Sequence, residues 1–116
     1  MIHLHVSISV PGATEPGYSD NFLVDTGATD SMAAASALKS AGISPVGRQS
    51  YELADGNRVE YDFGLGQIEF MGEITAGRVI FGPEGVEPIL GVTALESSAL
   101  SWIRPISDSD AYPRFR

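Results

Sequence analysis

"FLVDTGATDS", from Phe22 to Ser31, carries an apolar run directly into the carboxylate of Asp25 and then into small and polar residues. Asp and Gly are ordinary turn residues, so a simple turn that satisfies backbone donors is one interpretation. An unpaired carboxylate beside buried surface is costly, however, and such a group normally has a partner or keeps its proton. No Lys, Arg or His lies in this segment to pair with it.

A second Asp25 would be such a partner. Two carboxylates within hydrogen-bonding distance share one proton, so one acts as an acid while the other acts as a base. A water molecule held between them could lose a proton as it attacks a carbonyl group. Because the chain contains one Asp-Thr-Gly, a pair requires a second copy of the chain, with Asp25 on a twofold axis.

Composition narrows the remaining possibilities. The 116 residues, 43% of them hydrophobic, fit one domain, and a chain this short would gain stability from a partner subunit. The absence of cysteine excludes disulfides, thiolate metal sites and cysteine nucleophiles. A net charge of -8 with scattered basic residues argues against nucleic acid or anionic lipid as a partner. The first ten residues do not have the pattern of a secretion signal and no apolar run could span a bilayer, so we expect a cytoplasmic protein without membrane contact.

Most of the chain has the pattern of strands. Apolar or alternating segments separated by Gly, Pro and Asp-Gly turns predict strands at residues 2–10, 18–24, 50–54, 58–63, 67–70 and 77–81. His3 and His5 share one strand face, where exposed histidines are a simpler interpretation than a metal site, and we expect no metal.

Two helices interrupt the strands. The longer one is expected from Met32 to Ala41, with Asp30 or Ser31 as the N-cap and Gly42 just beyond its end. A short helix is expected over "TALESSAL", residues 93–100, which begins with the spacing of a capping box.

Two segments share a pattern. "FLVDTGAT" and "EPILGVTAL" each run from an apolar strand through glycine and small residues toward a helix. Either the chain contains an internal duplication, or both segments use glycine as many strand-to-helix turns do.

Three segments together, "FLVDTGAT", "LADGN" and "GRVIFGPEGVEPILGVTAL", resemble the retropepsin-like aspartic proteases of clan AA. These include the retroviral proteases, and the resemblance is closer to their single-domain bacterial and archaeal relatives. It covers about residues 22–96 and rests on Leu23-Val24-Asp25-Thr26-Gly27-Ala28 followed by Ile89-Leu90-Gly91. It implies a mainly β, closed barrel-like fold with one medium and one short helix. It also implies a homodimeric aspartic endopeptidase that uses no cofactor and cleaves extended peptides.

The resemblance also assigns roles to residues. Asp25 matches the catalytic aspartate, one from each subunit, and the hydroxyl of Thr26 would reach across the dimer. Gly27 and Ala28 complete the active-site loop and leave room for a substrate backbone. The resemblance, together with the position of a hairpin expected near residues 51–58, also suggests a set of substrate-binding residues. These are Thr29, Asp30, Leu53, Ala54, Asp55, Gly56, Val86 and Ile89.

A hairpin near residues 51–58 falls where the family has its flap, a mobile hairpin that closes over bound peptide. Asp-Gly between alternating runs predicts a turn whether or not anything binds beneath it. Tyr51 and Tyr61 could flank this flap or simply pack within the sheet. Leu90 and Gly91 match the strand that packs against the catalytic loop.

The chain departs from the retroviral pattern in one feature. There, an acidic residue and an arginine pair to brace the dimer, and Thr29 and Val92 take their places here.

We expect a protease domain over residues 1–106, with 100–106 as a possible interface strand, and a polar tail over 107–116. Two alternatives stay open: a non-catalytic dimeric peptide-binding or scaffold module of this fold, and a half-enzyme that acts within a larger assembly.

Overall fold

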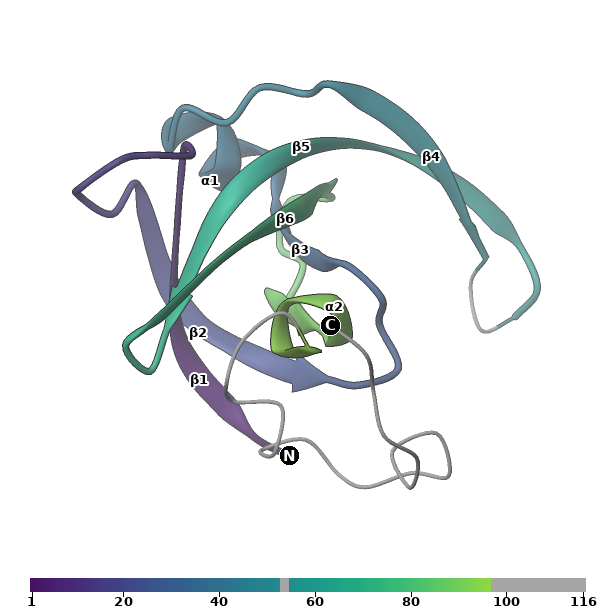
Figure 1. The fold of residues 1–116 in the computed structure, drawn as a ribbon. Coiled ribbons are helices and arrows are strands. Elements are labelled where there is room, and N and C mark those ends of the chain that lie inside the picture. Colours follow the sequence, from purple (N-terminus) through teal and green to yellow (C-terminus); the bar gives the residue numbers. More distant parts are fainter. Residues whose placement is uncertain (53–54, 97–116) are drawn as a thin grey trace.

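A computed structural model describes residues 1–52 and 55–96 of the chain. This part is mainly β, with seven strands and two short helices (Figure 1). The strands are β1 (His3–Ser9), β2 (Tyr18–Asp25), β3 (Ser31–Ala34), β4 (Gly47–Glu52), β5 (Arg58–Phe70), β6 (Glu73–Gly82) and β7 (Ile89–Gly91). The helices are α1 (Ala35–Ser40) and α2 (Val92–Glu96).

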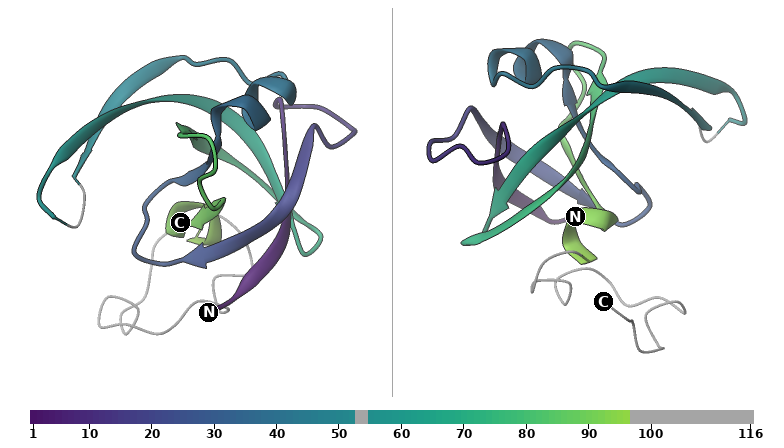
Figure 2. Two further views of the ribbon diagram at one scale, coloured as in Figure 1. Left: turned by 180° about the vertical axis from the view of Figure 1, so that it is seen from behind. Right: turned by 45° about the horizontal axis from the view of Figure 1, so that its top comes forward.

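The strands form one sheet in the order β1-β2-β7-β3-β6-β5-β4. An additional antiparallel pairing of β1 with β5, which places Val6 opposite Phe70, closes six of these strands into a barrel. β4 lies outside this closure and pairs with β5 alone. Both views of Figure 2 show the β4–β5 hairpin extending away from the barrel. The predicted mainly β, barrel-like fold with two helices is therefore confirmed.

The barrel interior holds the hydrophobic core. Alternation along β1 directs Val6 and Ile8 inward, where both are fully buried. The helices close the core with Leu38 of α1 and Leu95 of α2, which are also fully buried. Phe22, in the apolar run that leads to Asp25, and Phe70 are the largest of the fully buried side chains.

The predicted start of the longer helix is wrong. Ser31–Ala34 form strand β3, which pairs in parallel with β6 and also contacts β7. Small residues here permit either structure, and pairing with two neighbouring strands overrides the local helical pattern. The helix begins only at Ala35, so neither Asp30 nor Ser31 caps it.

A residue from another part of the chain supports the first turn of α1. Ala34 at the N-cap makes no side-chain hydrogen bond. Instead, the carboxylate of Glu84 accepts hydrogen bonds from the backbone N–H of Ser36 at 3.1 Å and from its hydroxyl at 2.6 Å. The predicted end of the helix is confirmed, because Gly42 has a φ of 89° and follows the last turn.

Other helix and strand boundaries also differ from those predicted from the sequence. The segments predicted at 58–63 and 67–70 are one continuous strand, β5, and β6 begins at Glu73 rather than near Gly77. α2 starts at Val92, one residue earlier than predicted. Residues 97–116, to which the rest of the predicted helix, the expected interface strand and the expected tail were assigned, lie outside the described residues.

An internal duplication is present in the topology. β1-β2-β3-α1 and β5-β6-β7-α2 take matching places, since β2 runs parallel to β7, β6 runs parallel to β3, and β3 and β7 meet antiparallel at the centre. When the sequences of the two halves are aligned from the ends of β2 and β6 onward, no gap is needed. In this alignment Asp25 is equivalent to Gly82, and Leu38 is equivalent to Leu95. The two segments that seemed alike are therefore not equivalent, because β7 is the neighbour of β2 and the counterpart of β3.

Candidate active site

Asp25 is the last residue of β2, and the strand register places it opposite Gly91 of β7. Its side chain is half-buried, and its Oδ1 accepts a hydrogen bond from the backbone N–H of Gly27 at 2.9 Å. The carbonyl of Asp25 accepts a second bond, from the N–H of Ala28 at 3.1 Å. The Asp-Thr-Gly segment thus forms a tight turn that fixes the direction of the carboxylate.

The N-terminus of α2 holds the loop that follows this turn. The first N–H groups of a helix have no partners within the helix and need acceptors from elsewhere. Here the N–H of Val92 donates to the carbonyl of Ala28 at 2.8 Å, and the N–H of Thr93 donates to the carbonyl of Thr29 at 3.1 Å. The loop and the helix therefore satisfy each other's backbone groups.

Gly91 packs against the same loop more closely than any other residue type could. A Cβ atom on Gly91 would lie 2.5 Å from the carbonyl carbon of Asp30 and 2.8 Å from the carbonyl oxygen of Thr29. The N–H of Gly91 donates to the hydroxyl of Ser31, which is buried, at 3.0 Å. This explains why a glycine stands at this position of β7.

A groove of about 770 Å³ lies between the active-site loop and the β4–β5 hairpin. On the barrel side it is lined by Asp25, Gly27, Ala28, Thr29, Asp30, Met32, Ile80 and Ile89, and on the hairpin side by Gln49, Ser50, Tyr51, Glu52 and Tyr61. In Figure 1, the hairpin arches over the side on which the chain passes from β2 to β3. Asp25 and Gly27 of the Asp-Thr-Gly turn thus line this groove.

The predicted site residues divide into three groups. Asp25, Gly27, Ala28, Thr29, Asp30 and Ile89 line the groove. Thr26, Asp55, Gly56 and Val86 do not line it: Thr26 is exposed, Asp55 and Gly56 belong to the hairpin turn, and Val86 lies in the segment between β6 and β7. Leu53 and Ala54 lie outside the described residues.

A family model described as "Aspartyl protease" matches residues 9–94, which include the Asp25 loop, the β4–β5 hairpin and β7. The chain belongs to the aspartyl protease family. No curated protein matches the chain. The mainly β barrel agrees with a retropepsin-like member of this family.

Several residues that line the groove of this aspartyl protease family member were not identified from the sequence: Met32, Ile80, Gln49, Ser50 and Glu52. Met32 was assigned to a helix. Ile80 and Gln49 could have been found from strand alternation, because they lie on the same sheet face as the predicted Tyr61 once the register of β4, β5 and β6 is known.

Tyr51 connects the hairpin to the active-site loop. Its hydroxyl donates a hydrogen bond to Oδ2 of Asp30 at 3.2 Å, and its ring lies 6.1 Å from that of Tyr61. Burial raises the pKa of Tyr51 above its usual 10.0, and the charge and hydrogen bond of Asp30 raise it further, while Arg78 acts in the opposite direction. Tyr51 therefore keeps its proton and remains a donor at neutral pH.

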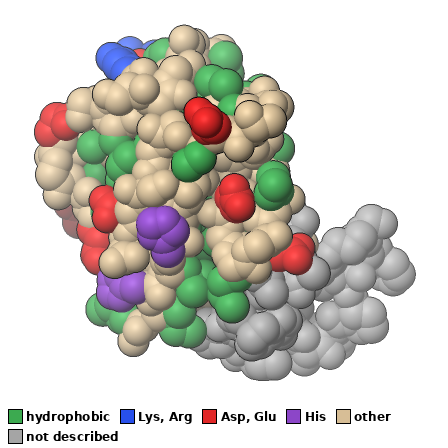
Figure 3. Space-filling model, turned by 90° about the vertical axis from the view of Figure 1, so that its left-hand side faces the viewer, with side chains coloured by type: hydrophobic (Ala, Val, Ile, Leu, Met, Phe, Trp, Pro, Cys, Tyr) green, Lys and Arg blue, Asp and Glu red, His purple; other side chains and the backbone are tan. Residues whose placement is uncertain are grey.

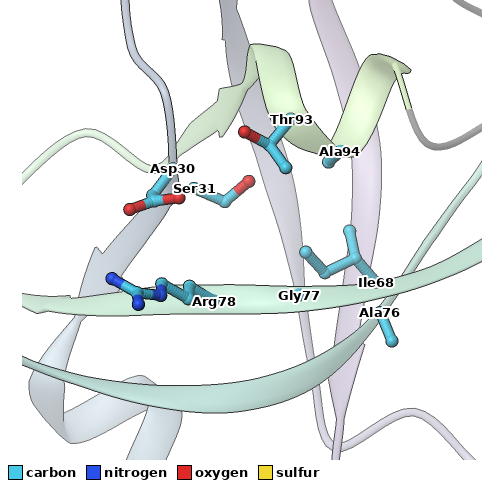
Figure 4. Close-up of a pocket in the computed structure, with 8 residues that line it drawn as sticks. All are labelled: Asp30, Ser31, Ile68, Ala76, Gly77, Arg78, Thr93 and Ala94. Atoms are coloured by element: carbon cyan, nitrogen blue, oxygen red, sulfur yellow. The ribbon is translucent and has the colours of Figure 1, made fainter. Parts of the chain in front are cut away.

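A second, much smaller pocket of about 10 Å³ shares Asp30 with the groove. Figure 4 shows it between β6, the start of β3 and α2, with Ile68 pointing toward the helix. This volume is enough for one water molecule and not for a substrate group. The larger groove beside Asp25 is accordingly the candidate active site.

Charged groups elsewhere do not form a comparable site. Within residues 1–52 and 55–96, no group of three or more His, Cys, Asp or Glu side chains comes together as a metal site. His3 instead pairs with Glu87, with Nε2 and Oε2 3.1 Å apart. On the face shown in Figure 3 acidic side chains are dispersed, and Lys and Arg appear only at the upper edge. No helix in the described part of the chain is long and apolar enough to cross a membrane.

Proposed function

We propose that the protein is a homodimeric aspartic endopeptidase in which each subunit contributes one Asp25. The observation that carries this proposal is the position of Asp25 in the groove, with Oδ1 held by the N–H of Gly27 at 2.9 Å. Its Oδ2 has no hydrogen-bond partner among residues 1–52 and 55–96, so it is free to meet a water molecule or a second carboxylate.

The second carboxylate has to come from another chain. The internal duplication does not supply it, because Gly82 stands where Asp25 would be expected in the second half. Thr26, beside Asp25, is exposed and makes no hydrogen bond within the described part of the chain, which leaves its hydroxyl available to a partner subunit. A twofold axis at this turn would bring two Asp25 side chains together.

Hydrolysis then follows from the shared proton. The ionised carboxylate takes a proton from a water molecule as the water oxygen attacks the carbonyl carbon of the peptide bond. The protonated carboxyl group donates its proton to the carbonyl oxygen as the tetrahedral intermediate forms. When this intermediate collapses, the carboxyl group that took the water proton donates it to the amine nitrogen and the carbon–nitrogen bond breaks. The other carboxylate takes a proton from a hydroxyl group of the intermediate, so the pair again holds one proton.

The groove supports an extended peptide as the substrate. Met32, Ile80 and Ile89 give it an apolar floor near the loop of Asp25, so we expect apolar side chains beside the cleaved bond. The β4–β5 hairpin would act as the flap, excluding water and pairing with the peptide backbone. The substrate-binding roles of Thr29 and Asp30 and the cytoplasmic location belong to the same proposal.

A mixing experiment tests whether two Asp25 residues act together. Wild type and the Asp25→Asn variant are mixed in varied ratio at constant total concentration and allowed to exchange subunits, and peptide cleavage is measured. If each active unit needs two Asp25 side chains, the rate falls as the square of the wild-type fraction. A rate that falls in direct proportion to that fraction would show that one subunit suffices and would refute the dyad.

A further inference from the structure

Two side-chain hydrogen bonds join the hairpin to the barrel beside the groove. The hydroxyl of Tyr51 donates to Oδ2 of Asp30 at 3.2 Å. The guanidinium of Arg78, on β6, donates from Nη1 to Oε1 of Gln49. Tyr51 and Gln49 are two residues apart on β4, so both side chains leave the same face of that strand.

The side chain of Arg78 is itself held in place. Its guanidinium carbon lies 4.3 Å from the centre of the Phe63 ring, which is a favourable cation–π arrangement. Figure 4 shows Arg78 and Asp30 toward the same end of the small pocket that both residues line. Asp30 follows the active-site loop directly, so a contact with Asp30 connects the hairpin to the segment that carries Asp25.

β4 depends on these contacts more than the other strands do. It is the edge strand of the sheet and pairs only with β5, whereas the other strands are part of the closed barrel. β4 also supplies Gln49, Ser50, Tyr51 and Glu52 to the wall of the groove. The position of this wall relative to Asp25 is therefore set by the β5 backbone and by the two side-chain bonds.

We infer that Asp30 and Arg78 are positioning residues that hold β4 across the groove through Tyr51 and Gln49. This inference rests on the proposed function only where it concerns cleavage, since the position of the hairpin can be measured without a substrate. Without these bonds the hairpin spends part of its time displaced from the groove. Because the fraction of binding-competent molecules falls, KM should rise more than kcat falls.

The absence of cysteine allows a direct distance measurement. Nitroxide labels are attached to Arg58→Cys at the start of β5 and Asn21→Cys on β2, and labelled protein is diluted with excess unlabelled protein so that distances within one subunit dominate. Tyr51→Phe and Gln49→Ala each remove one bond. Tyr18→Phe is the matched control, because it removes the Tyr18–Asp20 hydrogen bond of 3.1 Å on β2, and neither residue lines the groove.

We expect Tyr51→Phe and Gln49→Ala to broaden the distance distribution toward longer values, and the double variant to broaden it further. Tyr18→Phe should leave it unchanged. Asp30→Ala should behave as Tyr51→Phe does, while Asp30→Asn, which retains an acceptor oxygen, should restore the narrow distribution. In a cleavage assay KM should rise roughly two- to tenfold for Tyr51→Phe, the range that corresponds to one net hydrogen bond.

Distances in Tyr51→Phe and Gln49→Ala that match the wild type, or that change no more than in Tyr18→Phe, would overturn the inference. A fall in kcat at unchanged KM would also count against it. If the distances change as expected but no variant or wild type cleaves peptide, the positioning role stands and the proposed peptidase function fails.

Discussion

The buried hydroxyl of Ser31 accepts a hydrogen bond from the backbone N–H of Gly91, with the two atoms 3.0 Å apart. Ser31 begins the strand after the active-site loop, and Gly91 lies opposite Asp25 in the sheet. This bond therefore ties the two sides of the loop together. Among residues 1–52 and 55–96, the hydrogen bonds that hold the Asp25 turn and the adjoining strands come from backbone groups and one small side chain.

Replacing Ser31 by alanine should destabilise the protein by about 1–3 kcal/mol, because the N–H of Gly91 would stay buried without an acceptor. Ser7→Ala is the control: its hydroxyl bonds to Ser19 at 2.7 Å in an exposed position, and its loss should cost less than about 0.5 kcal/mol. Denaturant unfolding gives both values. If Ser31→Ala and Ser7→Ala lower the free energy of unfolding by the same amount, the buried Ser31–Gly91 hydrogen bond contributes no more to stability than an exposed one.

Gly91→Ala should be at least as damaging as Ser31→Ala. The new Cβ would lie 2.5 Å from the backbone of Asp30, and backbone cannot move aside as the end of a flexible side chain can. Overpacking of this kind costs about 1–3 kcal/mol, and the displaced loop should also reduce cleavage. Gly77→Ala, where a Cβ meets nothing within 4 Å, should fold normally. A Gly91→Ala protein as stable as Gly77→Ala would contradict the packing described for β7.

Glu84 should make the stability of the protein sensitive to acid. The hydroxyl and the backbone N–H of Ser36 donate hydrogen bonds to its carboxylate and lower the pKa of Glu84 below its usual 4.5. A carboxylate whose pKa is lower in the folded state stabilises that state above the unfolded pKa, and this contribution is lost as the pH falls through the folded pKa. Thermal unfolding of Glu84→Gln should therefore show a weaker dependence on pH below 4.5 than the wild type.

The exposed Glu69→Gln on β5 provides the control for this measurement. It should leave the slope of the melting temperature against pH as it is in the wild type. If Glu84→Gln and Glu69→Gln give the same slope, the cap that Glu84 provides for α1 does not contribute to stability.

The Asp25 turn and the predominance of strands could be predicted because their signals are local, whereas the closed barrel was expected only from the resemblance to retropepsin-like proteases. An apolar run that ends in Asp-Thr-Gly defines a strand and its turn within a few residues, and strict alternation in β1 identifies a strand with one buried face. The segment Ser31–Ala34 could not be assigned in this way. Its small residues are compatible with a helix, and only pairing with β6 and β7, which lie far along the chain, makes it a strand.

The hairpin side of the groove shows the same limit. An Asp-Gly turn predicted the hairpin, but not that Gln49 would meet Arg78 or that Tyr51 would meet Asp30. Such contacts depend on how far β5 bends over the barrel, which a pattern of residues does not specify. The sequence left an internal duplication open and suggested it from two segments that are not equivalent, so its correct alignment required the strand order.

The most direct test of the account is cleavage of a mixed peptide library from about pH 3 to pH 8 by wild type and Asp25→Asn, with the oligomeric state followed by sedimentation. The account predicts that wild type cleaves, most rapidly in mildly acidic solution where the pair of carboxylates holds one proton, and that its specific activity rises with the dimer fraction. Asp25→Asn should remain a folded dimer without activity. A folded wild-type dimer that cleaves nothing, or a rate that keeps rising into alkaline solution, would contradict the mechanism, and the first result would favour a peptide-binding module instead.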